Sequence, residues 1–293
     1  MKLIALFSFL LIALLWGTFY SVSKEVLQRM DPLVFAFLET SVTLPFALAF
    51  IFIHRKKISY DLVKRGFILG VLLALNLLIA ALALNYTTAT NTAFFPSIYG
   101  IVVAFYAWSL KKQKILMRTW IAGLLSLMGA LLLILENSQI TKQWHGDILA
   151  LIAPLFYAAY IFRLDYDTKN SEIALWPLLG IELIIMNLFC GIAALIFGNW
   201  PNFNHFGDYE TLIYVGLITT LLPSILSIFF QRYLSPVTVG FILILEPIFG
   251  AITAAIYLGE SLSMRGYFGG GLIVLASLIN TLAHLKSSSF KNH

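Results

Sequence analysis

The stretch at residues 235–260, SPVTVGFILILEPIFGAITAAIYLGE, decides the fold class, because it is apolar over a length that can cross a lipid bilayer. Near its middle stands a single acid, Glu246, which is followed at once by Pro247. A carboxylate at that depth is costly unless it is paired, neutralised or wetted by a cavity. A proline also removes a helix hydrogen bond and frees the carbonyl one turn earlier. These two adjacent residues therefore indicate a polar cavity inside the membrane and a helix break at Pro247.

The composition of the whole chain agrees with a membrane protein. Of the 293 residues, 60% are hydrophobic and 11% are charged, whereas soluble domains are about 25% charged. The single cysteine, Cys190, excludes an internal disulfide, and the five histidines are scattered without the spacing of metal ligands. We therefore expect no metal, no cofactor and no nucleic-acid partner.

Hydrophobic runs of spanning length recur along the entire sequence, and the connections between them are short. The first run resembles a signal peptide in its apolar core, but it has no convincing small-x-small cleavage site, so we interpret it as a retained helix. The runs cover residues 3–23, 32–53, 66–84, 88–110, 119–136, 146–163, 173–197, 209–230, 236–258 and 266–285.

The distribution of lysine and arginine supports this series of ten helices. If the N-terminus is cytoplasmic, fifteen of the nineteen basic residues lie on inner segments. Cytoplasmic loops of membrane proteins carry such an excess, so the pattern predicts that both termini are cytoplasmic. The basic residues on the outer segments are Lys24, Arg29, Lys142 and Arg265.

A weak internal repeat divides the chain into two halves. A shift of 147 residues places Trp120 on Tyr267 and Tyr99 on Glu246. Five helices per half is an odd number, so the second half enters the membrane upside down, as in many secondary transporters. We therefore predict an all-α polytopic fold of ten transmembrane helices, arranged as two inverted five-helix repeats.

Three stretches carry a family resemblance. LLWGTFYSVSK at residues 14–24 and LEPIFGAITAAIYLGESL at residues 245–262 resemble the first-helix and ninth-helix patterns of the drug/metabolite transporter (DMT) superfamily, and residues 265–276 are similar to its glycine-rich last helix. The resemblance covers the whole chain and implies two EamA-type repeats, here residues 1–145 and 146–293. It also implies an inner-membrane transporter of small metabolites, often amino acids.

Glu246 is the leading candidate for a binding residue. On a helix, the small and polar residues at its spacing would form the wall of a cavity, in which Glu246 binds a cation or an amine, or carries a proton. The alternative is a packing residue that is hydrogen-bonded to a neighbouring helix. The residues that share its face are Thr238, Ile242, Gly250, Thr253 and Tyr257.

Aromatic and amide side chains of four other helices are predicted to complete the cavity. Tyrosine joins an aromatic face to a hydroxyl, which suits a partly wet pocket. The alternatives are ordinary aromatic packing and, for an amide, an interhelical hydrogen bond. These candidates are Trp16, Tyr20, Asn76, Asn91, Phe95, Tyr99 and Tyr157.

Four charged residues near helix ends are candidate gates. Lys24 and Glu39 lie toward the outer face, and Arg163 and Glu182 lie toward the inner face. Each cation could pair with the acid of the next helix and form a gate that breaks and reforms. The alternative for the two cations is that their charged ends extend to the lipid headgroups.

The sequence therefore predicts a secondary transporter that works by alternating access on small metabolites, and first of all on amino acids or related amines. Its partners are a small-molecule substrate and the bilayer, while coupling to protons and assembly as a homodimer are left open. A membrane-embedded lipid- or prenyl-modifying enzyme would need paired acids for magnesium or a nucleophile with its base, which the sequence does not offer. A channel is disfavoured by the inverted repeat and the charged gates.

Overall fold

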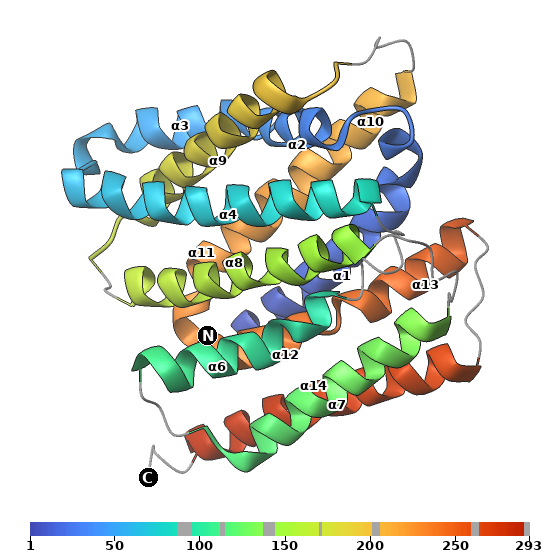
Figure 1. The fold of residues 1–293 in the computed structure, drawn as a ribbon. Coiled ribbons are helices and arrows are strands. Elements are labelled where there is room, and N and C mark those ends of the chain that lie inside the picture. Colours follow the sequence, from blue (N-terminus) through green and yellow to red (C-terminus); the bar gives the residue numbers. More distant parts are fainter. Residues whose placement is uncertain are drawn as a thin grey trace.

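The computed structural model shows a bundle of helices that run back and forth across the molecule (Figure 1). It describes residues 1–86, 95–111, 115–136, 144–169, 172–200, 206–258 and 264–289. Within these residues, six helical stretches are long and apolar enough to cross a membrane by themselves. These stretches are Lys2–Leu27, Pro32–Lys57, Tyr60–Ala83, Leu175–Phe197, Gly207–Tyr233 and Pro236–Tyr257.

Over its described residues, each of the ten predicted membrane spans corresponds to one helix or to consecutive helical segments, so the predicted all-α fold is confirmed; residues 88–94 of the fourth predicted span lie outside the described residues. In chain order they are α1 (Lys2–Leu27); α2 (Pro32–Ser41) with α3 (Leu44–His54); α4 (Tyr60–Tyr86); the short η2 (Phe95–Ile98) with α6 (Tyr99–Lys111); α7 (Met117–Glu136); α8 (Trp144–Thr168); α9 (Leu175–Phe197); α10 (Phe206–Tyr214), the π-helical η3 (Val215–Leu221) and α11 (Leu222–Phe230); α12 (Pro236–Leu243) with α13 (Glu246–Leu258); and α14 (Met264–Ser289). The 3₁₀ turns η1 (Arg55–Lys57) and η4 (Gln231–Tyr233) follow α3 and α11.

The two halves of the chain are inverted five-helix repeats. Helix α1 begins at the same face of the bundle at which α14 ends, and we call this the N-terminal face (left in Figure 1). Helix α8, which opens the second half, begins at the opposite face. Helices α7 and α14, the fifth helix of each half, lie side by side at the edge of the bundle.

Three of the described spans are interrupted near their middle, each a few residues before a proline. Residues 42–43 separate α2 from α3, residues 244–245 separate α12 from α13, and η3 widens the helix before Pro223. Proline has no N–H group to continue a helix, but it fits the first turn of a new one. The break predicted at Pro247 thus falls just ahead of it, and Pro247 is the second residue of α13.

A neighbouring helix stabilises the break in the second span. The side-chain amide of Asn187 on α9 donates to the carbonyl of Phe37 and to the hydroxyls of Thr40 and Ser41, at 3.3, 3.0 and 2.9 Å. In lipid, the polar groups around a broken helix have no water to bind, so they need such protein partners.

Ion pairs connect the two repeats at both faces. At the N-terminal face, the buried Asp167 of α8 binds Arg65 of α4 and Arg163 of its own helix, each at 2.7 Å. At the opposite face, Arg29 after α1 binds Asp208 of α10 at 2.7 Å, and this hydrogen bond raises the pKa of Arg29. The first pair joins the third span to the sixth, and the second joins the eighth span to the first. The two pairs are equivalent, because each joins the third span of one half to the first span of the other.

We expect Asp167→Asn to lower the melting temperature of the detergent-purified protein by the equivalent of about 2 kcal/mol, because it removes the anion shared by two arginines. The loss stays below that of a fully buried pair, because the arginine side chains are 22% and 30% exposed. Asp61, which is 66% exposed and also binds Arg65, provides the control. Asp61→Asn should change the melting temperature little, and equal shifts for both variants would contradict the assignment.

Candidate functional site

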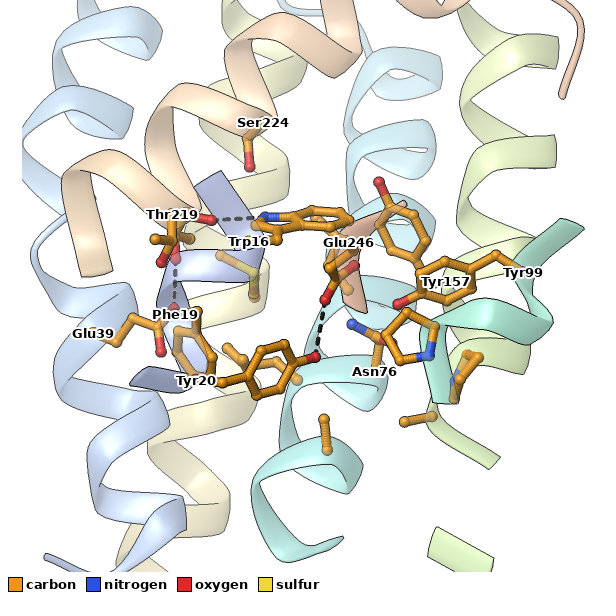
Figure 2. Close-up of a pocket in the computed structure, with 18 residues that line it drawn as sticks. Trp16, Phe19, Tyr20, Glu39, Asn76, Tyr99, Tyr157, Thr219, Ser224 and Glu246 are labelled. Carbon is orange, nitrogen blue, oxygen red and sulfur yellow. Dashed lines mark hydrogen bonds between the residues drawn. The ribbon is translucent and has the colours of Figure 1, made fainter. Parts of the chain in front are cut away.

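A cavity lies between the helices of the bundle. Its walls come from eight of the ten spans, while the described parts of α7 and α14 contribute no lining residue (Figure 2). The lining residues are Trp16, Phe19, Tyr20, Glu39, Leu73, Asn76, Leu77, Ala80, Pro96, Tyr99, Ala153, Pro154, Tyr157, Met186, Thr219, Thr220, Ser224 and Glu246.

The cavity is displaced toward the face opposite the termini. Lining residues between 16 and 20 of α1 and between 73 and 80 of α4 lie from the midpoint of their helix onward, as counted from the N-terminal face. On the N-terminal side, α4 packs against α8 and α9, where the side chains of Tyr160, Leu164 and Leu179 are fully buried. The described helices are therefore packed together on the N-terminal side of the cavity.

Glu246 is the first residue of α13, and it projects into the cavity (Figure 2). An acid at that position is favoured by the positive end of the helix dipole. Its side chain is 3% exposed, and its Oε1 accepts a hydrogen bond from the hydroxyl of Tyr20 at 2.9 Å. The other oxygen, Oε2, is buried and has no hydrogen-bond partner among the described residues.

Glu39 of α2 is a second acid in the same cavity, 2% exposed. Its Oε1 accepts a hydrogen bond from the hydroxyl of Thr220 in η3, and its Oε2 is buried without a partner in the described part of the chain. The gate predicted between Lys24 and Glu39 is therefore not formed in this conformation. The reason is that the face of α2 that carries Glu39 is turned toward the interrupted eighth span.

The gate predicted between Arg163 and Glu182 is not formed either. Arg163 binds Asp167, one turn further along α8, which keeps its charge close to the N-terminal face. Glu182 is fully buried and does not line the cavity; its Oε1 accepts a hydrogen bond from the hydroxyl of Tyr160 at 3.0 Å.

Aromatic rings from three helices meet beside Glu246. The ring of Trp16 meets that of Tyr157 edge-on at 5.0 Å, and the ring of Tyr99 lies 5.1 Å from Tyr157. The indole Nε1 of Trp16 also donates to the carbonyl of Thr219 at 2.9 Å. That carbonyl is available because Pro223, four residues later, has no N–H to offer it.

We expect Trp16→Phe to lower the melting temperature of the purified protein by the equivalent of about 1 kcal/mol, because the Thr219 carbonyl then loses its indole donor within the membrane. Trp108→Phe is the control, since that side chain is 54% exposed on α6. A shift for Trp16→Phe no larger than that for Trp108→Phe would show that the indole does not stabilise the interrupted span.

Of the other residues that were predicted to line the cavity, one does so, one lies elsewhere and two are not described. Asn76 lines the cavity, but Thr253 does not: its hydroxyl donates to the carbonyls of Gly17 and Gly250, at 3.1 and 3.0 Å. The break at 244–245 separates Thr238 and Ile242 from Glu246, whereas Thr253 stays on the same helix as Glu246 and lies against α1. Asn91 and the side chain of Phe95 lie outside the described residues.

Some lining residues were not anticipated from the sequence. Pro96 and Pro154 interrupt apolar runs, and Thr219 and Thr220 form a polar pair just before Pro223. A proline or a pair of hydroxyls inside a predicted membrane helix could have indicated these lining positions, as Glu246 and Pro247 indicated theirs. Phe19 and Met186 carry no such signal, because apolar side chains are common throughout these helices.

Comparison with known proteins identifies the family to which the chain belongs. A profile of the EamA-like transporter family matches residues 3–135 and again residues 144–282. An uncharacterised transporter of Archaeoglobus fulgidus is 29% identical over 279 residues, which cover 93% of this chain and 84% of that protein. Another from the same organism is 26% identical over 92% of this chain and 94% of its own length.

More distant similarity extends to a bacterial protein and to a solved structure. An uncharacterised transporter of Clostridium kluyveri is 21% identical over 96% of this chain and 94% of its own length. One crystal structure superimposes with a TM-score of 0.73 at 12% identity, covering 95% of this chain and 96% of the other, and it supports the fold alone. Since the family profile matches both halves and nearly the whole length, the chain belongs to the EamA-like transporter family of the DMT superfamily and is a multi-pass membrane transporter rather than an enzyme.

Proposed function

We propose that this transporter carries amino acids or related amines through the central cavity by alternating access, in exchange for protons. The observation that supports this best is Glu246. It is a buried acid in mid-membrane with one oxygen held by Tyr20 and the other without a protein partner among the described residues. An amine of the substrate is a suitable partner for that oxygen.

The same acid supports proton exchange. An ionised, unpaired carboxylate at this depth costs several kcal/mol. When the substrate amine leaves, a proton is the simplest cation that can replace it. Occupancy by either an amine or a proton would couple the movement of the substrate to the movement of protons in the opposite direction.

Alternating access is supported by the two inverted halves and by the interrupted spans that surround the cavity. The cavity lies toward one face, and the described helices pack together on the other side of it, as expected for one of two related conformations. We place the chain in the cytoplasmic membrane with the N-terminal face inside. The basic residues Arg55, Lys56 and Lys57 after α3 lie at that face and favour this orientation. We place the boundary between the two repeats at residues 145/146.

The test is transport by the full chain in proteoliposomes. We would measure uptake and counter-exchange of a panel of labelled amino acids and amines under an imposed pH gradient. We expect saturable uptake of at least one compound, counter-exchange with the unlabelled compound, and loss of accumulation when the gradient is collapsed. Non-saturating flux without counter-exchange would indicate a channel, and the absence of movement of any compound would overturn the proposed substrate class.

A further inference from the structure

We infer that the cavity selects organic cations that lack a carboxylate, and that Glu39 and Glu246 together form the cation site. This inference rests on the proposed function, because it takes the central cavity as the place where the substrate binds. It narrows the substrate class from amino acids and amines to amines alone.

The first argument is the charge of the lining. Glu39 comes from the second span and Glu246 from the ninth, so each repeat contributes one acid to the same cavity. Each has one oxygen bound to a hydroxyl and the other buried without a partner among the described residues. None of the lining residues is Lys, Arg or His. The sequence of residues 87–94, ahead of the lining residue Pro96, contains no basic residue either. A buried carboxylate is costly unless it is paired, and the described lining of this cavity supplies no cation.

The second argument is that a substrate carboxylate would find no cationic partner among the described lining residues. The N-terminus of α13 lies at the cavity, and backbone N–H groups at such a position can bind an anion. However, Pro247 has no N–H, and the N–H groups of Ile248 and Phe249 both donate to the carbonyl of Leu245. The lining side chains that could donate, such as Asn76 and Ser224, are neutral. A zwitterionic amino acid would thus bring its carboxylate close to two acids without a compensating cation.

The third argument is the aromatic wall. Trp16, Tyr20, Tyr99 and Tyr157 surround Glu246 (Figure 2). An ammonium group close to the face of such rings is attracted by their negative electrostatic potential, and the attraction strengthens when water is excluded. The two acids and the aromatic rings therefore both favour an organic ammonium ion as the ligand.

The experiment compares three probes that share a phenyl ring and differ in charge: phenethylamine, phenylalanine and 3-phenylpropionate. Their binding to the detergent-purified full chain is measured by isothermal titration calorimetry at neutral pH. We expect phenethylamine to bind at least ten-fold more tightly than phenylalanine, and 3-phenylpropionate to show no binding. Glu39→Gln and Glu246→Gln should each weaken phenethylamine binding at least ten-fold.

Glu182→Gln is the matched control, because Glu182 is equally buried and also bound by a tyrosine but lies outside the cavity. It should bind phenethylamine like the wild type, and thermal melting shows whether each variant is folded. Equal or tighter binding of phenylalanine, or no binding of any probe by the wild type, would overturn the inference. If phenylalanine is bound and transported, the inference fails while the proposed function stands. If phenethylamine is bound selectively but no amine or amino acid is moved in proteoliposomes, the cation site stands and the proposed function fails.

Discussion

Glu246→Gln should abolish the pH-gradient-driven accumulation of substrate in proteoliposomes. Glutamine has nearly the same size and can still accept the hydrogen bond from Tyr20, but it can neither bind a proton nor balance an ammonium ion. We expect accumulation to fall to the level of protein-free liposomes. We also expect substrate affinity to fall at least ten-fold, which corresponds to about 1.4 kcal/mol.

Glu182→Gln distinguishes a site effect from a general effect of removing a buried acid. Glu182 is fully buried and accepts a hydrogen bond from Tyr160, but it does not line the cavity. Its glutamine variant should retain gradient-driven accumulation. If both variants lose accumulation equally, the loss results from disturbing the fold and not from removing an acid of the transport site. If Glu246→Gln keeps counter-exchange at full affinity and loses only the response to the gradient, Glu246 carries the proton without binding the substrate.

The fold was predictable because a lipid bilayer allows few backbone conformations to a segment that crosses it. Spanning segments must be helical and about 20 residues long, so hydrophobic runs locate them directly. Glu246 was conspicuous for the same reason, since an acid in lipid needs a physical explanation. The structure gathers Trp16, Tyr20, Tyr99 and Tyr157 around that acid, although their role in binding stays a prediction.

The side-chain pairings were not predictable, because they depend on how each helix is rotated about its axis. Glu39 was expected beside Lys24, but the structure turns it toward Thr220, whose position depends on the π-helical η3. Thr253 was expected on the cavity wall, but two turns beyond Glu246 the helix α13 packs against α1, where the Thr253 hydroxyl donates to the Gly17 carbonyl. Sequence spacing assumes continuous α-helices, and it fails at the interruptions that shape this cavity.

The position of Glu246 also depends on how closely α1 approaches α13, and Gly17 permits that approach. A Cβ added at Gly17 would lie 2.6 Å from the Cβ of Phe249, 2.7 Å from the backbone nitrogen of Gly250 and 2.8 Å from the carbonyl carbon of Phe249. Two of these atoms belong to the backbone and cannot rotate away. Gly17→Ala should therefore push the helices apart and destabilise the protein by about 2–3 kcal/mol, measured as a lower melting temperature.

Gly271→Ala is the matched control, because nothing lies within 4 Å of a Cβ added at Gly271 in α14. Alanine is favoured over glycine inside a helix by up to about 1 kcal/mol, so this variant should melt at or slightly above the wild-type temperature. Gly17→Ala has the same helical advantage, and any loss of stability comes from the helix contact. Separation of α1 from α13 would also lengthen the 2.9 Å hydrogen bond between Tyr20 and Glu246, since the two residues lie on these helices. Gly17→Ala should therefore lose transport as well as stability, and wild-type melting with wild-type transport would show that α1 does not hold Glu246 in place.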